Sequence, residues 1–120
     1  MSSENNNNEL EKTPPSAPKA QKEQTVTKQQ TIEHILYEIH KKAHDCYKNE
    51  DFEQAISHYE EYVELNPNDP FIYTTLGFLY KKLDENNTLE KQIECYEKAV
   101  KVNPNYTPAL RSLALTYQFV

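Results

Sequence analysis

The chain has 120 residues, 37% of them hydrophobic and 27% charged, so it has room for one domain and a polar extension. Its net charge of -6 is opposite in sign to that of a non-specific nucleic-acid binder, so no nucleic-acid partner is expected. A single glycine argues against glycine-built phosphate loops and dinucleotide fingerprints.

Residues 1–30 differ in composition from the rest of the chain. They contain an asparagine run, three prolines, and four Glu balanced by four Lys. Too few apolar side chains are present to offset the conformational entropy lost on folding, so this stretch is predicted to be a disordered polar arm. The alternative is a short partner-binding motif, because Pro15 and Pro18 have P-x-x-P spacing. The apolar residues of the arm are Met1, Leu10, Ala17, Ala20 and Val26.

From residue 31 onward, apolar residues recur at the three- and four-residue spacing of amphipathic helices. Asp51 and Gln54 form a capping-box signature at one helix start. Asn66-Pro67 ends that helix, and Asp69-Pro70 begins the next. The pattern predicts helices over 31–48, 52–65, 70–83, 88–102 and 108–119.

The helical region repeats itself. The segments 64–68 (ELNPN) and 101–105 (KVNPN) have the same punctuation, 37 residues apart. Tyr73, Leu76, Gly77 and Tyr80 match Leu110, Leu113, Ala114 and Tyr117 at the same distance. This pattern resembles the tetratricopeptide repeat family, whose repeats of about 34 residues are helix–turn–helix units. The resemblance covers residues 36–120, about two and a half repeats.

The resemblance implies an all-α domain over residues 31–120, built as a right-handed superhelix of antiparallel helix–turn–helix repeats. Small residues at Ala43, Gly77 and Ala114 are expected to let neighbouring helices approach closely. Three extra residues in the middle repeat are placed in 83–89, where they would lengthen the turn.

Members of this family bind partner peptides in a concave groove formed by the first helix of each repeat, so the resemblance implies a protein-interaction scaffold. The predicted lining holds four fixed cations, two histidines and no carboxylate, whereas helix 52–65 carries four Glu and no Lys. The expected partner is another protein that presents an extended acidic segment with an apolar or aromatic anchor. The alternative is that these side chains are merely solvated. Helical phase assigns to the groove Tyr37, His40, His44, Tyr47, Lys48, Phe71, Thr74, Phe78, Lys81, Lys82, Arg111, Leu115 and Gln118.

Some family members clamp the C-terminal carboxylates of chaperones with Lys, Asn and Arg side chains. The matching positions here are His40, His44, Thr75, Pro108 and Ser112, none of which is of the expected type. A carboxylate clamp needs fixed positive donors at these points, so a chaperone-tail function is not expected.

No catalytic constellation is found. His40 and His44 have the i, i+4 spacing of a chelating pair, but no third ligand is placed with them, so neither a metal nor a cofactor is expected. Cys46 lies on the apolar stripe, and Cys95 has no basic neighbour before Lys98. The expected function is therefore non-enzymatic.

Two other functional interpretations stay open. The segment could be the targeting or regulatory array of a larger enzyme or complex whose sequence continues beyond residue 120. It could also be a plain helical bundle, which would be favoured if Lys81, Lys82 and Arg111 did not converge. The last helix carries an apolar face that no later helix covers, which predicts self-association or a longer array. This face consists of Leu113, Leu115, Tyr117, Phe119 and Val120.

No long apolar run occurs in the chain, so neither a transmembrane helix nor a membrane partner is expected. The first residues lack the apolar stretch of a secretory signal. Two cysteines without such a signal fit a reducing compartment. The cytoplasm is the expected location, with the nucleus as the alternative.

Overall fold

The computed structural model describes residues 26–120, and within them the chain forms helices and no strand. Residues 1–25, which carry most of the predicted arm and its proline motif, lie outside the described residues. The chain divides into two units, residues 1–33 and 34–120, and the larger one holds α4 to α7 and most of α3. The helices are α3 (Lys28–Lys48), α4 (Phe52–Leu65), α5 (Pro70–Asp84), α6 (Leu89–Val102) and α7 (Thr107–Tyr117).

Two helix ends differ from the predicted ones by two or more residues, for local reasons, and three others differ by one residue. Helix α3 begins at residue 28 rather than 31, because Thr27 and Gln30 form a capping box: the Gln30 backbone N–H donates to Thr27 Oγ1, and the Thr27 N–H donates to Gln30 Oε1. Helix α7 ends at Tyr117 rather than 119, because its last residues bond three positions back and tighten the final turn.

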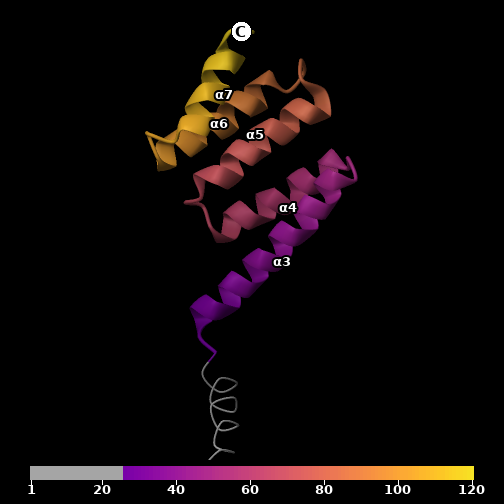
Figure 1. Cartoon of the computed structure of the whole chain (residues 1–120), viewed down its shortest axis with the longest axis vertical. Coiled ribbons are helices and arrows are strands. Elements are labelled where there is room, and N and C mark those ends of the chain that lie inside the picture. The colour runs from indigo at the N-terminus through magenta and orange to yellow at the C-terminus, as the bar shows by residue number, and fades with distance from the viewer. Residues whose placement is uncertain (1–25) are drawn as a thin grey trace, which may run out of the picture. The chain divides into compact units, whose positions relative to one another are not determined.

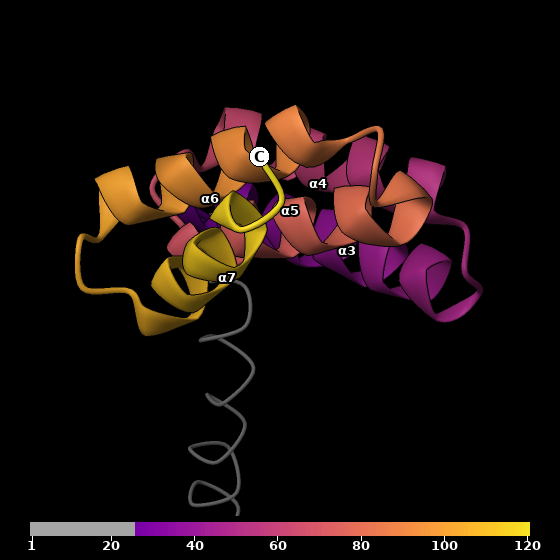
Figure 2. The same ribbon diagram turned by 90° about the horizontal axis from the view of Figure 1, so that it is seen from above.

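Within residues 34–120 the helices form two layers, with α3, α5 and α7 in one and α4 and α6 in the other (Figures 1 and 2). Helices α3 and α4 make one helix–turn–helix unit, α5 and α6 make a second, and α7 is the first helix of a third. The predicted all-α helical-repeat fold is therefore confirmed. No helix in residues 26–120 combines the length and the apolar character needed to cross a bilayer.

Helices α5 and α6 pack closely at Gly77 of α5. A Cβ atom placed there would lie 2.7 Å from ring carbon Cζ of Tyr96, well inside van der Waals contact. The expected role of a small residue therefore holds at Gly77, and Ala43 is completely buried in the core. Ala114 is exposed instead, because no described helix covers that side of α7. The main core cluster comprises Ala43, Ala55, Ile56, Tyr59, Ile72, Leu76, Leu79 and Cys95.

A hydrogen bond with the same geometry joins each repeat to the next. The Tyr80 hydroxyl donates to Glu60 Oε2 at 2.8 Å, and the Tyr117 hydroxyl donates to Glu97 Oε2 at 2.8 Å. Burial and this bond to Glu60 raise the pKa of Tyr80 above its ordinary value. The equivalent contacts lie 37 residues apart, so the sequence repeat is also a repeat of contacts.

The three-residue insertion is not confined to the turn, which corrects the prediction. Helix α5 runs four residues past Tyr80, whereas α3 runs two residues past the equivalent Cys46. The turn after α5 has four residues, and the turn after α3 has three. Asp84 stabilises the longer helix end because its carboxylate accepts from the backbone N–H and the side-chain amide of Asn87. Two of the extra residues thus lengthen the helix and one lengthens the turn.

The exposed apolar side chains of α7 also differ in part from the predicted uncovered face. Leu113 is half-buried, whereas the other four residues of the predicted face are exposed, and two of these, Leu115 and Phe119, line a pocket shared with α5 and α6. Leu110 and Ala114 are exposed beside Tyr117, because they occupy the positions that α6 would cover one repeat earlier.

The turn between α3 and α4 carries backbone strain. Glu50 has φ of 61°, the left-handed conformation that favours glycine. The Glu50 N–H bonds to the Tyr47 carbonyl and the Asp51 N–H to the Cys46 carbonyl, which is a Schellman motif. This motif holds the backbone of Glu50 in the left-handed region, which costs free energy for a residue that has a Cβ atom.

Replacing Glu50 by Gly should therefore raise the free energy of unfolding by roughly 0.5–1 kcal/mol. The matched control is Asp84→Gly at the last residue of α5, which should lower the free energy of unfolding by about 1 kcal/mol, because Asp84 is helical and its carboxylate accepts from the Asn87 side-chain amide. Urea unfolding of both variants measures the difference. Equal signs for the two substitutions would contradict the assignment of strain to Glu50.

Candidate functional site

The side chains predicted to line the groove all lie on α3, α5 and α7 or directly after α7. Ten of the thirteen are exposed, three are half-buried, and none is buried. This distribution is that of a surface rather than of a helix–helix interface. The half-buried members are His40, Tyr47 and Thr74.

Four of these rings form a continuous series, here called the aromatic row: His40, His44, Tyr47 and Phe78. The ring centroids of His40 and His44 are 6.4 Å apart and nearly parallel, and those of His44 and Tyr47 are 6.2 Å apart. Tyr47 and Phe78 are separated by 6.1 Å, which carries the row from α3 to α5. The row therefore joins the first helices of two consecutive repeats.

Residues of α4 fix the position of the row from behind. The ring of His40 meets Tyr59 edge-on at 5.5 Å, and Tyr59 is buried. Tyr47 also contacts Phe52, the first residue of α4, with ring centroids 6.1 Å apart. Packing on both sides restricts the rotamers of His40 and Tyr47, so this part of the surface is preorganised.

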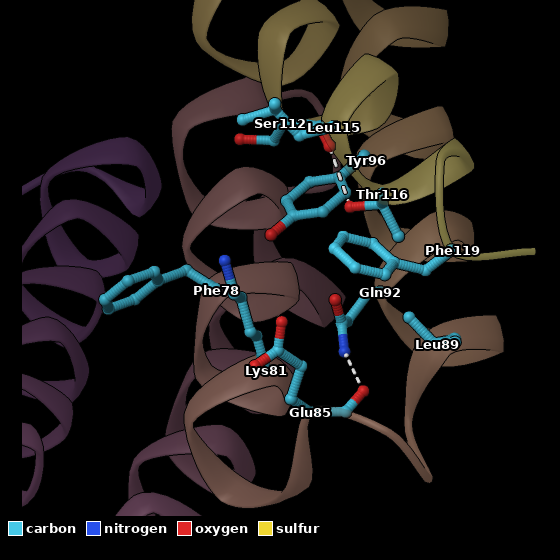
Figure 3. A pocket seen from close by; sticks show the side chains of 10 residues that line it. All are labelled: Phe78, Lys81, Glu85, Leu89, Gln92, Tyr96, Ser112, Leu115, Thr116 and Phe119. Atoms are coloured by element: carbon cyan, nitrogen blue, oxygen red, sulfur yellow. Dashed lines mark hydrogen bonds between the residues drawn. The ribbon is translucent and has the colours of Figure 1, made fainter.

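A pocket adjoins each end of the row. Near His40, a shallow pocket is lined by Tyr37, His40, Lys41 and His44. Near Phe78, a second pocket lies among α5, α6 and α7 and is here called the three-helix pocket (Figure 3). It is lined by Phe78, Lys81, Glu85, Leu89, Gln92, Tyr96, Ser112, Leu115, Thr116 and Phe119.

The predicted cations occupy different surroundings. The Lys48 ammonium lies 4.0 Å from Asp45, and the Lys82 ammonium lies 5.5 Å from the centroid of the Phe78 ring. Across residues 26–120, Lys81, Lys82 and Arg111 take part in no salt bridge. Their charge is therefore available to a partner.

The structure brings together only part of the predicted groove. Lys81 shares the three-helix pocket with Leu115 of α7, whereas Arg111, the neighbour of the pocket residue Ser112, does not line it. The Thr74 hydroxyl donates to the Pro70 carbonyl of its own helix. The predicted residues that line neither pocket are Tyr47, Lys48, Phe71, Thr74, Lys82, Arg111 and Gln118.

Sequence reasoning missed several lining residues, of which Glu85 matters most. Helical phase predicted a groove without carboxylates. Glu85 lines the same pocket as Lys81, so this prediction is wrong at this end of the surface. Glu85 belongs to the insertion, which has no counterpart in the first repeat, so the repeat alignment could not place it. The spacing of Lys81 and Glu85, at i and i+4, was the available signal.

The thiols are held in their protonated form. Burial raises the pKa of Cys95 to about 12. Burial also raises the pKa of Cys46, and the carboxylates of Asp51 and Asp45 raise it further. A thiol is a poor nucleophile in this form. In the described part of the chain, no group of three or more His, Cys, Asp or Glu side chains is arranged to hold a metal ion.

Comparison with known families gives two matches. A family described as TPR repeat matches residues 43–84, which cover the end of α3, α4 and α5. A family described as Tetratricopeptide repeat matches residues 72–106, which cover most of α5 and all of α6. Together the matches extend over residues 43–106, more than half of the chain. No curated protein matches the chain.

Proposed function

This chain belongs to the tetratricopeptide repeat family, a family of protein–protein interaction modules, and we propose that it binds an extended acidic segment of a partner protein. Proteins of this family are generally scaffolds rather than enzymes. The proposed site is the surface of α3, α5 and α7 that carries the aromatic row and its adjoining cations.

The observation that carries the proposal is the continuity of the aromatic row across two repeats. Tyr47 meets Phe78 at 6.1 Å, so one extended segment lying across α3 and α5 would meet an unbroken series of rings. Rings already held by packing lose little conformational entropy on binding. The exposed Tyr37 and Phe71 side chains extend this aromatic surface beyond the row.

The charge distribution favours an acidic partner. Lys81, Lys82 and Arg111 lie on the α5 and α7 side of the molecule, and α4 in the other layer carries four Glu and no basic residue except histidine. Exposed ion pairs contribute only about 0.2–1 kcal/mol each. Charge therefore steers the partner and selects it, whereas the rings supply most of the contact area.

Reversing two groove charges, Lys81→Glu and Lys82→Glu together, should weaken partner binding about tenfold or more, because each attraction becomes a repulsion. The control, Lys91→Glu with Lys101→Glu on α6, makes the same change in net charge outside the groove. Affinity capture compares both variants with the wild-type chain. Partners retained by the control and lost by the groove variant are expected, and a partner set unchanged by the groove variant would contradict the proposal.

We propose, as a second function, that the open side of α7 associates with another copy of the chain. Leu110, Ala114 and Tyr117 are exposed, and each lies 37 residues after a residue of α5 that is buried or half-buried. The equivalent Gly77 is covered by Tyr96 of α6. The observation that supports association is therefore an exposed apolar face whose earlier counterpart in this chain is half-buried at Tyr73 and Tyr80 and buried at Gly77.

Light scattering should give a mass above that of one chain, which falls to the single-chain value for Leu110→Lys, since a charge at the centre of an apolar interface opposes association. The control is Leu65→Lys, a change at another exposed leucine, at the end of α4. A single-chain mass for the wild-type protein at high concentration would contradict the self-association.

A further inference from the structure

The three-helix pocket has walls of mixed character and a limited size. Leu89, Leu115 and Phe119 supply apolar walls, and Gln92 and Thr116 bring polar groups to the interior (Figure 3). The ring of Phe78, at the edge of the pocket, points toward α3. The volume of the pocket is about 90 Å³. That is roughly three times the volume of a water molecule in the liquid and well below the roughly 150 Å³ of a cavity that holds benzene.

Gln92 places a free hydrogen-bond acceptor in this pocket. Its side chain is only 1% exposed, and its Nε2 donates to the Glu85 carbonyl and to Thr88 Oγ1, both at 2.9 Å. Within residues 26–120, Gln92 Oε1 accepts no hydrogen bond. Every side-chain nitrogen or oxygen that is fully enclosed in this part of the chain has a hydrogen-bond partner. Oε1 must therefore be accessible from the pocket, and Figure 3 shows it turned away from Glu85, on the side of the Phe119 ring.

The two donor bonds fix the direction of the amide. Because Nε2 is held by a carbonyl and a hydroxyl at the turn after α5, rotating the amide would lose the bond to Glu85. The acceptor is thus preorganised for a donor that enters from outside. The neighbouring Thr116 hydroxyl is already used, because it donates to the Ser112 carbonyl at 2.7 Å.

We propose, on the basis of the proposed function, that the three-helix pocket receives a threonine side chain of the bound segment. Its hydroxyl would donate to Gln92 Oε1, and its methyl group would contact the walls formed by Leu115 and Phe119. Valine offers the methyl groups without a donor, and an aromatic ring exceeds the volume.

The test uses three uncharged probes, the N-acetyl amides of threonine, valine and phenylalanine, titrated into the full isotope-labelled chain and followed by NMR. The threonine probe should shift the Gln92 side-chain amide and the Leu115 methyl signals saturably, with at least about fivefold tighter binding than valine, because valine leaves the acceptor unmet. The phenylalanine probe should shift neither signal.

Leu115→Trp should abolish the response to threonine, because an indole at this exposed position fills the pocket. Leu65→Trp is the control, a change at an exposed leucine at the end of α4 that does not line the pocket. Unchanged signals from Ala55 and Ile56 in the core show that both variants are folded.

Equal binding of valine and threonine, or no saturable shift of the pocket signals, would overturn the proposal. So would pocket signals that move with protein concentration alone, since a second copy would then be the occupant. The probes carry no charge, so Lys82→Glu should not affect them. The two proposals can also fail separately. If charge reversal leaves partner capture unchanged while the threonine probe still binds, the acidic-segment function is wrong and the pocket assignment stands.

Discussion

The close approach of α5 and α6 at Gly77 is the constraint on which the rest of the structure depends. Helix α5 lies between the two helices of the other layer and also contacts α7, so its position sets theirs. Only a residue without a side chain leaves room for the buried ring of Tyr96 at this point. The ring cannot move aside cheaply, because it is 97% enclosed by the same core.

The functional surface follows from this packing. With α5 fixed in this position, the Tyr80 hydroxyl bonds to Glu60 of the preceding repeat. The exposed ring of Phe78 contacts the ring of Tyr47 on α3. The aromatic row thus exists because two repeats are stacked in a fixed register, not because of any single helix. The same stacking of α7 on α6 closes the three-helix pocket over Gln92.

The sequence periodicity predicted most of the fold but few details of the site. The 37-residue register predicted the order of the helices, the close helix packing at Gly77 and the exposure of the groove positions, because all three depend on helical phase. The left-handed Glu50 could be suspected only from its place at a turn that often holds glycine. Glu85 and the role of Gln92 could not be predicted, because both depend on how an insertion without an internal counterpart folds. The pairing of Tyr80 with Glu60 was visible as a repeated 20-residue spacing once the register was known.

The free energy of unfolding of Gly77→Ala tests the central packing claim most directly, because two effects of this change have opposite signs. Helix propensity alone favours alanine by about 1 kcal/mol in a helix interior. The contact with Tyr96 instead predicts a loss of about 1–3 kcal/mol, the cost of overpacking a core. Measured by urea denaturation, a lower free energy of unfolding is the result predicted here. A variant as stable as the wild-type chain, or more stable, would contradict the account.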